Sequence, residues 1–289
     1  MPSPAPMPVP SSSQSLSPSR AGDFMTCPLL YRFRAIDRLP EPPSKAATRG
    51  TVVHAVLEQL YDLPQGDRSL EAATGLVPTV WQQVLSTDEQ LGDLFSGDDG
   101  SLAAEWLDGT ESLLSTYFTL EDPTRLQPAD RELKLSVELA GGLVLRGYVD
   151  RLDVAPDGAM RVVDYKTGRS PAEAFQQKAM FQMRFYALAL WRQRQEVPRL
   201  LQLLYLGDGQ VIQYEPDEDD LLAMERKVIA LAAAIRRATE TGDWRPRTSR
   251  LCDWCAHRAL CPAWGGTPPP LPEKADPERG SGTSEGVQG

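Results

Sequence analysis

The stretch Gly147–Gly168, GYVDRLDVAPDGAMRVVDYKTG, decides the fold of this chain. Valine, leucine and tyrosine fill two segments on either side of Pro156-Asp157-Gly158, a sequence typical of a turn. The stretch therefore predicts two strands joined as a hairpin. Polar residues interrupt both strands at Asp150, Asp164 and Lys166, and the last two leave the same face because they are two positions apart. Two carboxylates beside an ammonium group can hold a hard divalent cation and act on water next to it.

This segment resembles the PD-(D/E)xK nuclease superfamily, in its RecB-like branch. The resemblance is to a hairpin of the form G-x-x-D-R-x-D, here Gly147–Asp153, followed by a D-x-K strand. It implies that Asp150, Asp164 and the backbone carbonyl of Tyr165 bind Mg²⁺ or Mn²⁺. It also implies that Lys166 orients the attacking water and stabilises negative charge on the phosphorus. The alternative is that the two aspartates are surface strand residues in salt bridges with Arg151 or Lys166.

A segment upstream, Arg49–Glu58 with the sequence RGTVVHAVLE, resembles the G-x-x-x-H helix start of the same family. The resemblance implies His54 as a further metal ligand. Thr51 is suited to cap the helix, which would place His54 in the first turn. The alternative is that this histidine is an ordinary surface or core residue.

A segment downstream, Gln182–Tyr186 with the sequence QMRFY, resembles the Q-x-x-x-Y helix of the family. The i, i+4 spacing places Gln182 and Tyr186 on one helical face. The family uses these two residues at the rim of the active site, against the nucleic-acid strand. Because the surrounding helix is rich in apolar groups, Tyr186 could instead be a core residue.

The four cysteines are one early residue, Cys27, and a late C-x2-C-x5-C group of Cys252, Cys255 and Cys261. The pattern resembles the iron–sulfur version of the RecB-like fold, found in the nuclease subunit of the AddAB helicase–nuclease and in CRISPR-associated adaptation nucleases. In that version one early and three late cysteines bind a 4Fe–4S cluster. Structural zinc held by four cysteines is the alternative, and spacing alone does not separate the two. Disulfides are disfavoured because no secretory signal peptide is evident and C-x2-C is more often a metal or redox element.

An acidic protein is not expected to bind nucleic acid, but the charge of this chain is unevenly distributed. The net charge is −10, but residues 69–124 hold eleven acidic residues and no lysine or arginine. The remainder of the chain is therefore close to neutral, and local basic faces can still bind phosphates. We interpret residues 69–124 as an acidic helical insertion that is turned away from the substrate or forms a partner surface.

The order of predicted elements indicates an α/β fold. Helices are expected near 50–62, 70–86, 102–119, 172–195 and 218–241, and strands near 131–139, 143–154, 160–166, 200–206 and 210–214. The expected architecture is a restriction-endonuclease-like core, a mixed β-sheet flanked by helices. Residues 1–18 are expected to be a disordered leader, 19–262 the nuclease domain and 263–289 a disordered tail. No run of apolar residues is long enough for a membrane span, and we expect a cytoplasmic protein.

These features together predict a metal-dependent deoxyribonuclease that is an end-directed or single-strand exonuclease in DNA repair or recombination. Two alternatives stay open. One is a non-catalytic iron–sulfur subunit that binds DNA or acts as a scaffold in a helicase–nuclease complex, and the other is a zinc-stapled interaction module. The chain lacks a G-x-x-x-x-G-K-[ST] phosphate loop, so any helicase would be a separate partner subunit.

Overall fold

The computed structural model describes residues 15–95, 101–173 and 176–271. They form two compact units, each described by itself. The first contains residues 15–22 together with Pro42–Ile235, and the second contains Asp23–Glu41 and residues 236–271. Among the described residues, no helix combines the length and the apolar character needed to cross a lipid bilayer.

The first unit is built on a six-stranded mixed sheet. The strands are β1 (Ser15–Leu16), β2 (Asp130–Leu139), β3 (Leu143–Val154), β4 (Met160–Lys166), β5 (Leu200–Tyr205) and β6 (Gln210–Tyr214). The order is β1-β3-β4-β5-β6, with β2 also paired to β3. The β1–β3 and β4–β5 pairs are parallel and the others are antiparallel. The mixed sheet expected from the sequence is confirmed.

The predicted turn at residues 156–158 joins β3 to β4. Gly158 has a φ of +90°, a conformation that glycine adopts without steric penalty. Its amide donates to the carbonyl of Ala155 at 2.9 Å, and the side chain of Asp157 accepts from Ala159 at 3.1 Å. This turn sets the register in which Arg151 lies opposite Val163. The same register, continued by one residue, places Asp150 beside Asp164.

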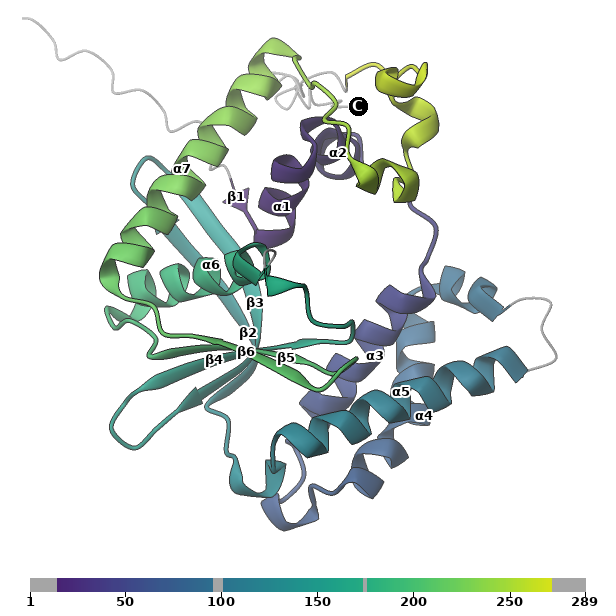
Figure 1. Ribbon diagram of the computed structural model, residues 1–289, viewed down its shortest axis with the longest axis vertical. Coiled ribbons are helices and arrows are strands. Elements are labelled where there is room, and N and C mark those ends of the chain that lie inside the picture. The colour runs from purple at the N-terminus through teal and green to yellow at the C-terminus, as the bar shows by residue number, and fades with distance from the viewer. Residues whose placement is uncertain (1–14, 96–100, 174–175, 272–289) are drawn as a thin grey trace, which may run out of the picture. The chain divides into compact units, whose positions relative to one another are not determined.

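Helices cover both faces of the sheet (Figure 1). The first group is α3 (Lys45–Leu60), α4 (Leu70–Thr87) and α5 (Ser101–Leu120). Their apolar side chains share one core with Val163, Tyr165, Leu204 and Leu206 of the sheet. Helix α6 (Gln176–Arg194) contacts β2, β3, β4 and β5, and α7 (Glu218–Thr241) follows the β6 strand. This arrangement brings α3 and α6 to the two strands that carry the polar motif.

Two boundaries differ from the prediction. Helix α3 begins at Lys45, with Ser44 as its N-cap, so Thr51 is not the cap and His54 lies in the third turn. The reason is that Lys45–Arg49 contains good helix formers directly after a serine that can accept from the amide of Ala47. The prediction of a leader over 1–18 is also wrong at its end, because Ser15–Leu16 pairs with β3. Residues 1–14 lie outside the described part, as do residues 272–289 of the predicted tail.

The acidic segment is not a separate appendage. Helices α4 and α5, which span most of residues 69–124, contribute Val77, Val80, Trp81, Trp106 and Tyr117 to the main core. The indole rings of Trp81 and Trp106 lie 5.0 Å apart. Burial on this scale means that the two helices are part of the fold that holds the sheet.

The second unit joins two ends of the chain. Its early part contains the end of α1 (Pro18–Thr26), α2 (Pro28–Tyr31) and a short helical turn at Arg32–Ile36, and its late part contains short helices at Arg250–Trp254, Arg258–Leu260 and Pro262–Trp264. The ring of Tyr31 stacks on Trp244 with centroids 5.9 Å apart. Buried His257 donates to or accepts from Glu41 at 2.8 Å. These contacts connect segments more than two hundred positions apart.

Candidate functional site

The backbone of Tyr165 is the point where three elements meet. Its amide donates to the Oδ2 atom of Asp150 at 2.8 Å, and its carbonyl oxygen lies 2.9 Å from the Nε2 atom of His54. The Nδ1 atom of His54 is in turn 3.4 Å from Asp150 Oδ2. Helix α3 and strands β3 and β4 thus bring together the histidine, the first aspartate and the carbonyl that the sequence comparison with the family implied.

A third acidic residue completes this group, and sequence reasoning missed it. One ligand atom each from His54, Glu132 and Asp150 lie within 4.8 Å of one another. Among the residues that the structure describes, no other set of three His, Cys, Asp or Glu residues meets this criterion. Glu132 has a φ of +45° within β2, a strained conformation for a residue other than glycine. The strand register pairs its neighbours Arg131 and Leu133 with Arg151 and Val149, so Glu132 lies opposite Asp150.

The pKa values of Glu132, Asp164 and His54 are all raised at this site, where burial and the gathered negative charges act on them. Burial and the charge of Asp150 raise the pKa of Glu132 to about 7. Burial, together with Asp150 and against the opposing charge of Lys166, raises the pKa of Asp164 to about 6. Burial alone would lower the pKa of His54, but its hydrogen bond to Asp150 and the charges of Asp150 and Asp164 outweigh this and raise it to about 9. Such a cluster has a deficit of positive charge that a cation would relieve.

Asp164 and Lys166 lie beside this group and are held by α6. The Nζ atom of Lys166 is 2.6 Å from Asp164 Oδ2 and donates to Gln182 Oε1 at 2.9 Å. The amide nitrogen of Gln182 donates to Asp164 Oδ1 at 2.8 Å and to the hydroxyl of Tyr186 at 2.9 Å. Asp164 is 1 % exposed and Lys166 is partly exposed. Four of the five residues predicted as catalytic, all except Asp150, therefore form one hydrogen-bonded chain that reaches solvent through the ammonium group.

The buried face behind the site is organised by Arg151. Its guanidinium donates to the hydroxyl of Tyr165 at 2.8 Å and to that of Tyr61 at 2.9 Å. It also pairs with Glu121, which directly follows α5, at 2.8 Å and with Asp153 at 3.1 Å. The salt bridge proposed as an alternative for Asp150 is thus made by Asp153 instead.

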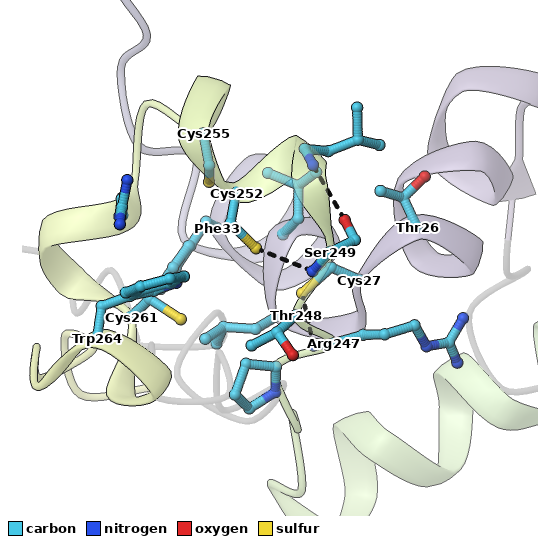
Figure 2. Close-up of a pocket in the computed structure, with 15 residues that line it drawn as sticks. Thr26, Cys27, Phe33, Arg247, Thr248, Ser249, Cys252, Cys255, Cys261 and Trp264 are labelled. Carbon is cyan, nitrogen blue, oxygen red and sulfur yellow. Dashed lines mark hydrogen bonds between the residues drawn. The ribbon is translucent and has the colours of Figure 1, made fainter.

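The four cysteines line one pocket in the second unit (Figure 2). The cavity has a volume of about 50 Å³, several times the roughly 10–15 Å³ that one water requires. The amide of Arg247 donates to the sulfur of Cys27, and that of Ser249 donates to the sulfur of Cys252, each at 3.3 Å. Burial raises the pKa of Cys255, and the three other cysteines act in the same direction. Backbone donors aimed at sulfur are the surroundings that thiolate ligands require.

The sulfur spacing bears on the choice between the two candidate groups. Tetrahedral zinc with Zn–S bonds of about 2.3 Å requires sulfur atoms about 3.8 Å apart. No three of the four cysteine sulfurs, all of them in the described part of the chain, lie within 4.8 Å of one another. A 4Fe–4S cluster holds each thiolate on a different iron and therefore sets the sulfurs farther apart. The four cysteines therefore do not form a ready-made tetrahedral zinc site.

Comparisons with known proteins agree with this geometry. The profile of the PD-(D/E)XK nuclease superfamily matches residues 15–262. The Gene 69 protein of Mycobacterium phage D29 is 28 % identical in an alignment of 193 positions that covers 60 % of this chain and 68 % of the phage protein. The crystal structure of a putative exonuclease from Eubacterium rectale has a TM-score of 0.57 and 14 % sequence identity. The match covers 85 % of this chain and 88 % of that one. At that identity the likeness shows the fold alone.

Proposed function

The chain belongs to the PD-(D/E)XK nuclease superfamily, and we propose that it is a metal-dependent DNA nuclease that acts on single strands or ends. The setting we propose is DNA repair or recombination. The observation that carries the catalytic part is the convergence of His54, Glu132 and Asp150 beside the Asp164–Lys166 pair. Two carboxylates opposite each other on paired strands repel, and a bound cation removes that repulsion.

The ligand set fits a hard divalent ion. His54, Asp150, Asp164 and the carbonyl of Tyr165 would hold Mg²⁺ or Mn²⁺, and Glu132 adds a further carboxylate. Oxygen donors with one imidazole suit these ions and give no reason to expect a soft metal. When bound, such an ion polarises the scissile phosphate and lowers the pKa of a coordinated water.

Lys166 and the residues of α6 supply the remaining chemistry. The ammonium group of Lys166 is placed by Asp164 and Gln182, so it enters the reaction already oriented. It would position the attacking water by a hydrogen bond and stabilise the charge that grows on the phosphate oxygens. Gln182 and Tyr186 form a rigid rim, because the ring of Tyr186 is buried and its hydroxyl accepts from Gln182. We propose that this rim contacts the nucleic-acid strand.

We further propose that Cys27, Cys252, Cys255 and Cys261 bind a 4Fe–4S cluster with a structural role. The support is the pocket that the four cysteines share and the two backbone amides that donate to sulfur. A link between Cys27 and the late cysteines closes a very long loop, which restricts the unfolded chain.

A cleavage assay on the full chain tests the proposed activity. The substrate is single-stranded DNA labelled at the 5′ or the 3′ end, with Mn²⁺ or Mg²⁺ added to metal-free protein. We expect cleavage that stops with a chelator, returns with Mn²⁺ and is abolished in Lys166→Ala. The control is Lys227→Ala, which removes an exposed lysine that lies over the ring of Phe181. DNA binding without metal-dependent cleavage by the wild type would instead support the non-catalytic subunit.

A further inference from the structure

Arg151 is the largest fully buried side chain among the described residues, and the reaction proposed above does not use it. Its exposed fraction is 0 %. Isolating a guanidinium from water carries a large free-energy penalty unless every donor finds a partner. The identity of those partners therefore indicates what the fold gains from the charge.

The charge of Arg151 is balanced by two carboxylates from different elements. Glu121, which directly follows α5, accepts from Nη2 at 2.9 Å and lies 2.8 Å from Nη1, a two-pronged contact. Asp153, two positions along β3, lies 3.1 Å from Nε. Glu121 also contacts Arg161 at 3.3 Å and accepts from Gln202 at 3.3 Å. The acidic segment thus supplies a counter-charge to the centre of the sheet.

The remaining donors of Arg151 converge on tyrosine hydroxyls. Nη1 donates to Tyr165 at 2.8 Å, to Tyr61 at 2.9 Å and to Tyr117 at 3.4 Å. The hydroxyls of Tyr61 and Tyr117 lie 2.5 Å apart. Because Tyr61 caps the C-terminus of α3, Tyr117 belongs to α5 and Tyr165 to β4, one guanidinium ties three elements to the β3 strand that carries it.

Three of the elements that Arg151 joins, β3, β4 and α3, carry candidate metal ligands. Strand β3 carries both Asp150, which lies in the candidate metal site, and Arg151, which contacts the tyrosine hydroxyls behind it. Strand β4 presents the backbone of Tyr165 to His54 and Asp150, and the hydroxyl of the same residue to Arg151. Helix α3 carries His54, which contacts Tyr165 and Asp150, and it ends at its C-cap Tyr61, about two turns later, whose hydroxyl accepts from Arg151. Each element is therefore fixed twice, once at the site and once behind it.

We propose that Arg151 is a positioning residue for the metal centre, and that Tyr61, Tyr117, Tyr165 and Glu121 are the contacts through which it acts. This inference rests on the proposed metal site. Loss of one hydroxyl lets α3 or α5 move relative to β3 and β4. A shift of a few tenths of an ångström then changes the distances among His54, Tyr165 and Asp150. Helix α5 is in consequence part of the metal site, not a removable insertion.

Direct measurement of Mn²⁺ binding tests the proposal without relying on activity. Replacing Arg151 itself risks a failure to fold, so the test uses Tyr61→Phe, Tyr117→Phe and the double variant in the full chain. Free Mn²⁺ is followed by electron paramagnetic resonance, and thermal unfolding of the metal-free protein is recorded in parallel. The matched control is Tyr214→Phe. Tyr214 lies on β6, and its hydroxyl donates to Asp220 at 2.6 Å and does not contact Arg151.

We expect the double variant to bind Mn²⁺ about 10–100-fold more weakly, the range typical of losing an outer partner of a metal ligand. We expect Tyr214→Phe to bind it as the wild type does, although its unfolding temperature also falls. If the double variant binds Mn²⁺ as tightly as the wild type, Arg151 only stabilises the fold and the positioning role is wrong. If the wild type itself binds no Mn²⁺, the metal site fails and this inference fails with it. The two failures are therefore distinguishable.

Discussion

Gly147 lies directly against the ring of Tyr186. A Cβ atom at Gly147 would approach Cε1 of Tyr186 to 2.6 Å, closer than side chains pack in folded proteins. The glycine of the G-x-x-D motif and the tyrosine of the Q-x-x-x-Y motif are thus one packing pair that joins β3 to α6. This contact fixes the position of the Tyr186 ring, and therefore the place where its hydroxyl accepts the hydrogen bond from Gln182.

Gly147→Ala should therefore displace Tyr186 and disturb the chain from Gln182 to Asp164 and Lys166. Overpacking of this kind costs about 1–3 kcal/mol of stability. Misplacement of the catalytic groups should reduce the rate of cleavage by on the order of tenfold to a hundredfold. Thermal unfolding and single-turnover cleavage measure the two effects. Gly75→Ala is the control, because nothing lies within 4 Å of that glycine. Wild-type cleavage by Gly147→Ala would show that the position of Tyr186 is not critical.

Glu132→Gln should have opposite effects on the metal-free and the metal-bound protein. The carboxyl of Glu132 is half-buried beside Asp150, and its pKa is raised to about 7. Removing this charge at about pH 8 should stabilise the metal-free fold. The same change should weaken Mn²⁺ binding by at least the roughly tenfold typical of an outer partner. Thermal unfolding with and without Mn²⁺ reports both, with exposed Glu138→Gln on the same strand as the control. Equal stabilisation by Mn²⁺ in Glu132→Gln and the wild type would remove Glu132 from the ligand set.

The stability of the metal-free protein should fall as the pH rises from about 5.5 to about 9. The folded pKa values of Glu132, Asp164 and His54 are about 7, about 6 and about 9, each above the ordinary value of its group. The folded state therefore binds these protons more tightly than the unfolded chain. The contribution of His54 is complete below about pH 6.5 and is lost as the pH passes through about 9.

Mn²⁺ should reverse this trend. Metal binding requires deprotonated ligands, so affinity should rise over the same range of pH. Unfolding temperatures at several pH values, with and without Mn²⁺, should diverge as the pH increases. In the double variant His54→Asn with Glu132→Gln the divergence should largely vanish. A constant separation between the two curves in the wild type would contradict the assignment of these groups as ligands.

Cys255→Ser should prevent binding of the 4Fe–4S cluster that we propose for the second unit, and it should destabilise the protein. Loss of a cross-link that closes so long a loop is expected to cost on the order of several kcal/mol. Anaerobic purification with analysis of iron, sulfide and zinc, followed by thermal unfolding, measures both. Ala256→Ser, at an exposed neighbouring position, should retain iron, sulfide and wild-type stability. Stoichiometric zinc in a colourless and fully stable wild type would replace the iron–sulfur assignment with zinc.

The local parts of the fold could be predicted from the sequence. The β3–β4 hairpin is encoded by a Pro-Asp-Gly turn between β-rich segments, and the periodic helices α4, α5 and α7 are found within one or two residues of their expected bounds. The start of α3 was placed too late because Ser44 competes with Thr51 as a cap. The pairing of Ser15–Leu16 with β3 could not be foreseen, because two residues carry no periodic signal.

The candidate site was predictable where motifs are contiguous and not where the backbone is unusual. Asp150, Asp164 and Lys166 follow from the hairpin, whereas Glu132 has no motif of its own. Its signal is register: counting back from the Gly141-Gly142 turn places Glu132 opposite Asp150. The contacts of Arg151 with α3 and α5 depend on long-range packing that no local pattern encodes.

The central claim is that three elements hold a divalent cation beside Lys166, and a crystal of the wild-type protein soaked in Mn²⁺ tests it most directly. An anomalous difference map recorded at the manganese edge locates the ion independently of any assumption about the site. The account predicts one strong peak roughly 2.1 Å from a nitrogen of His54 and an oxygen of Asp150, with Glu132 or Asp164 completing the shell. A map with ordered manganese elsewhere and no peak between His54 and Asp150 would contradict it.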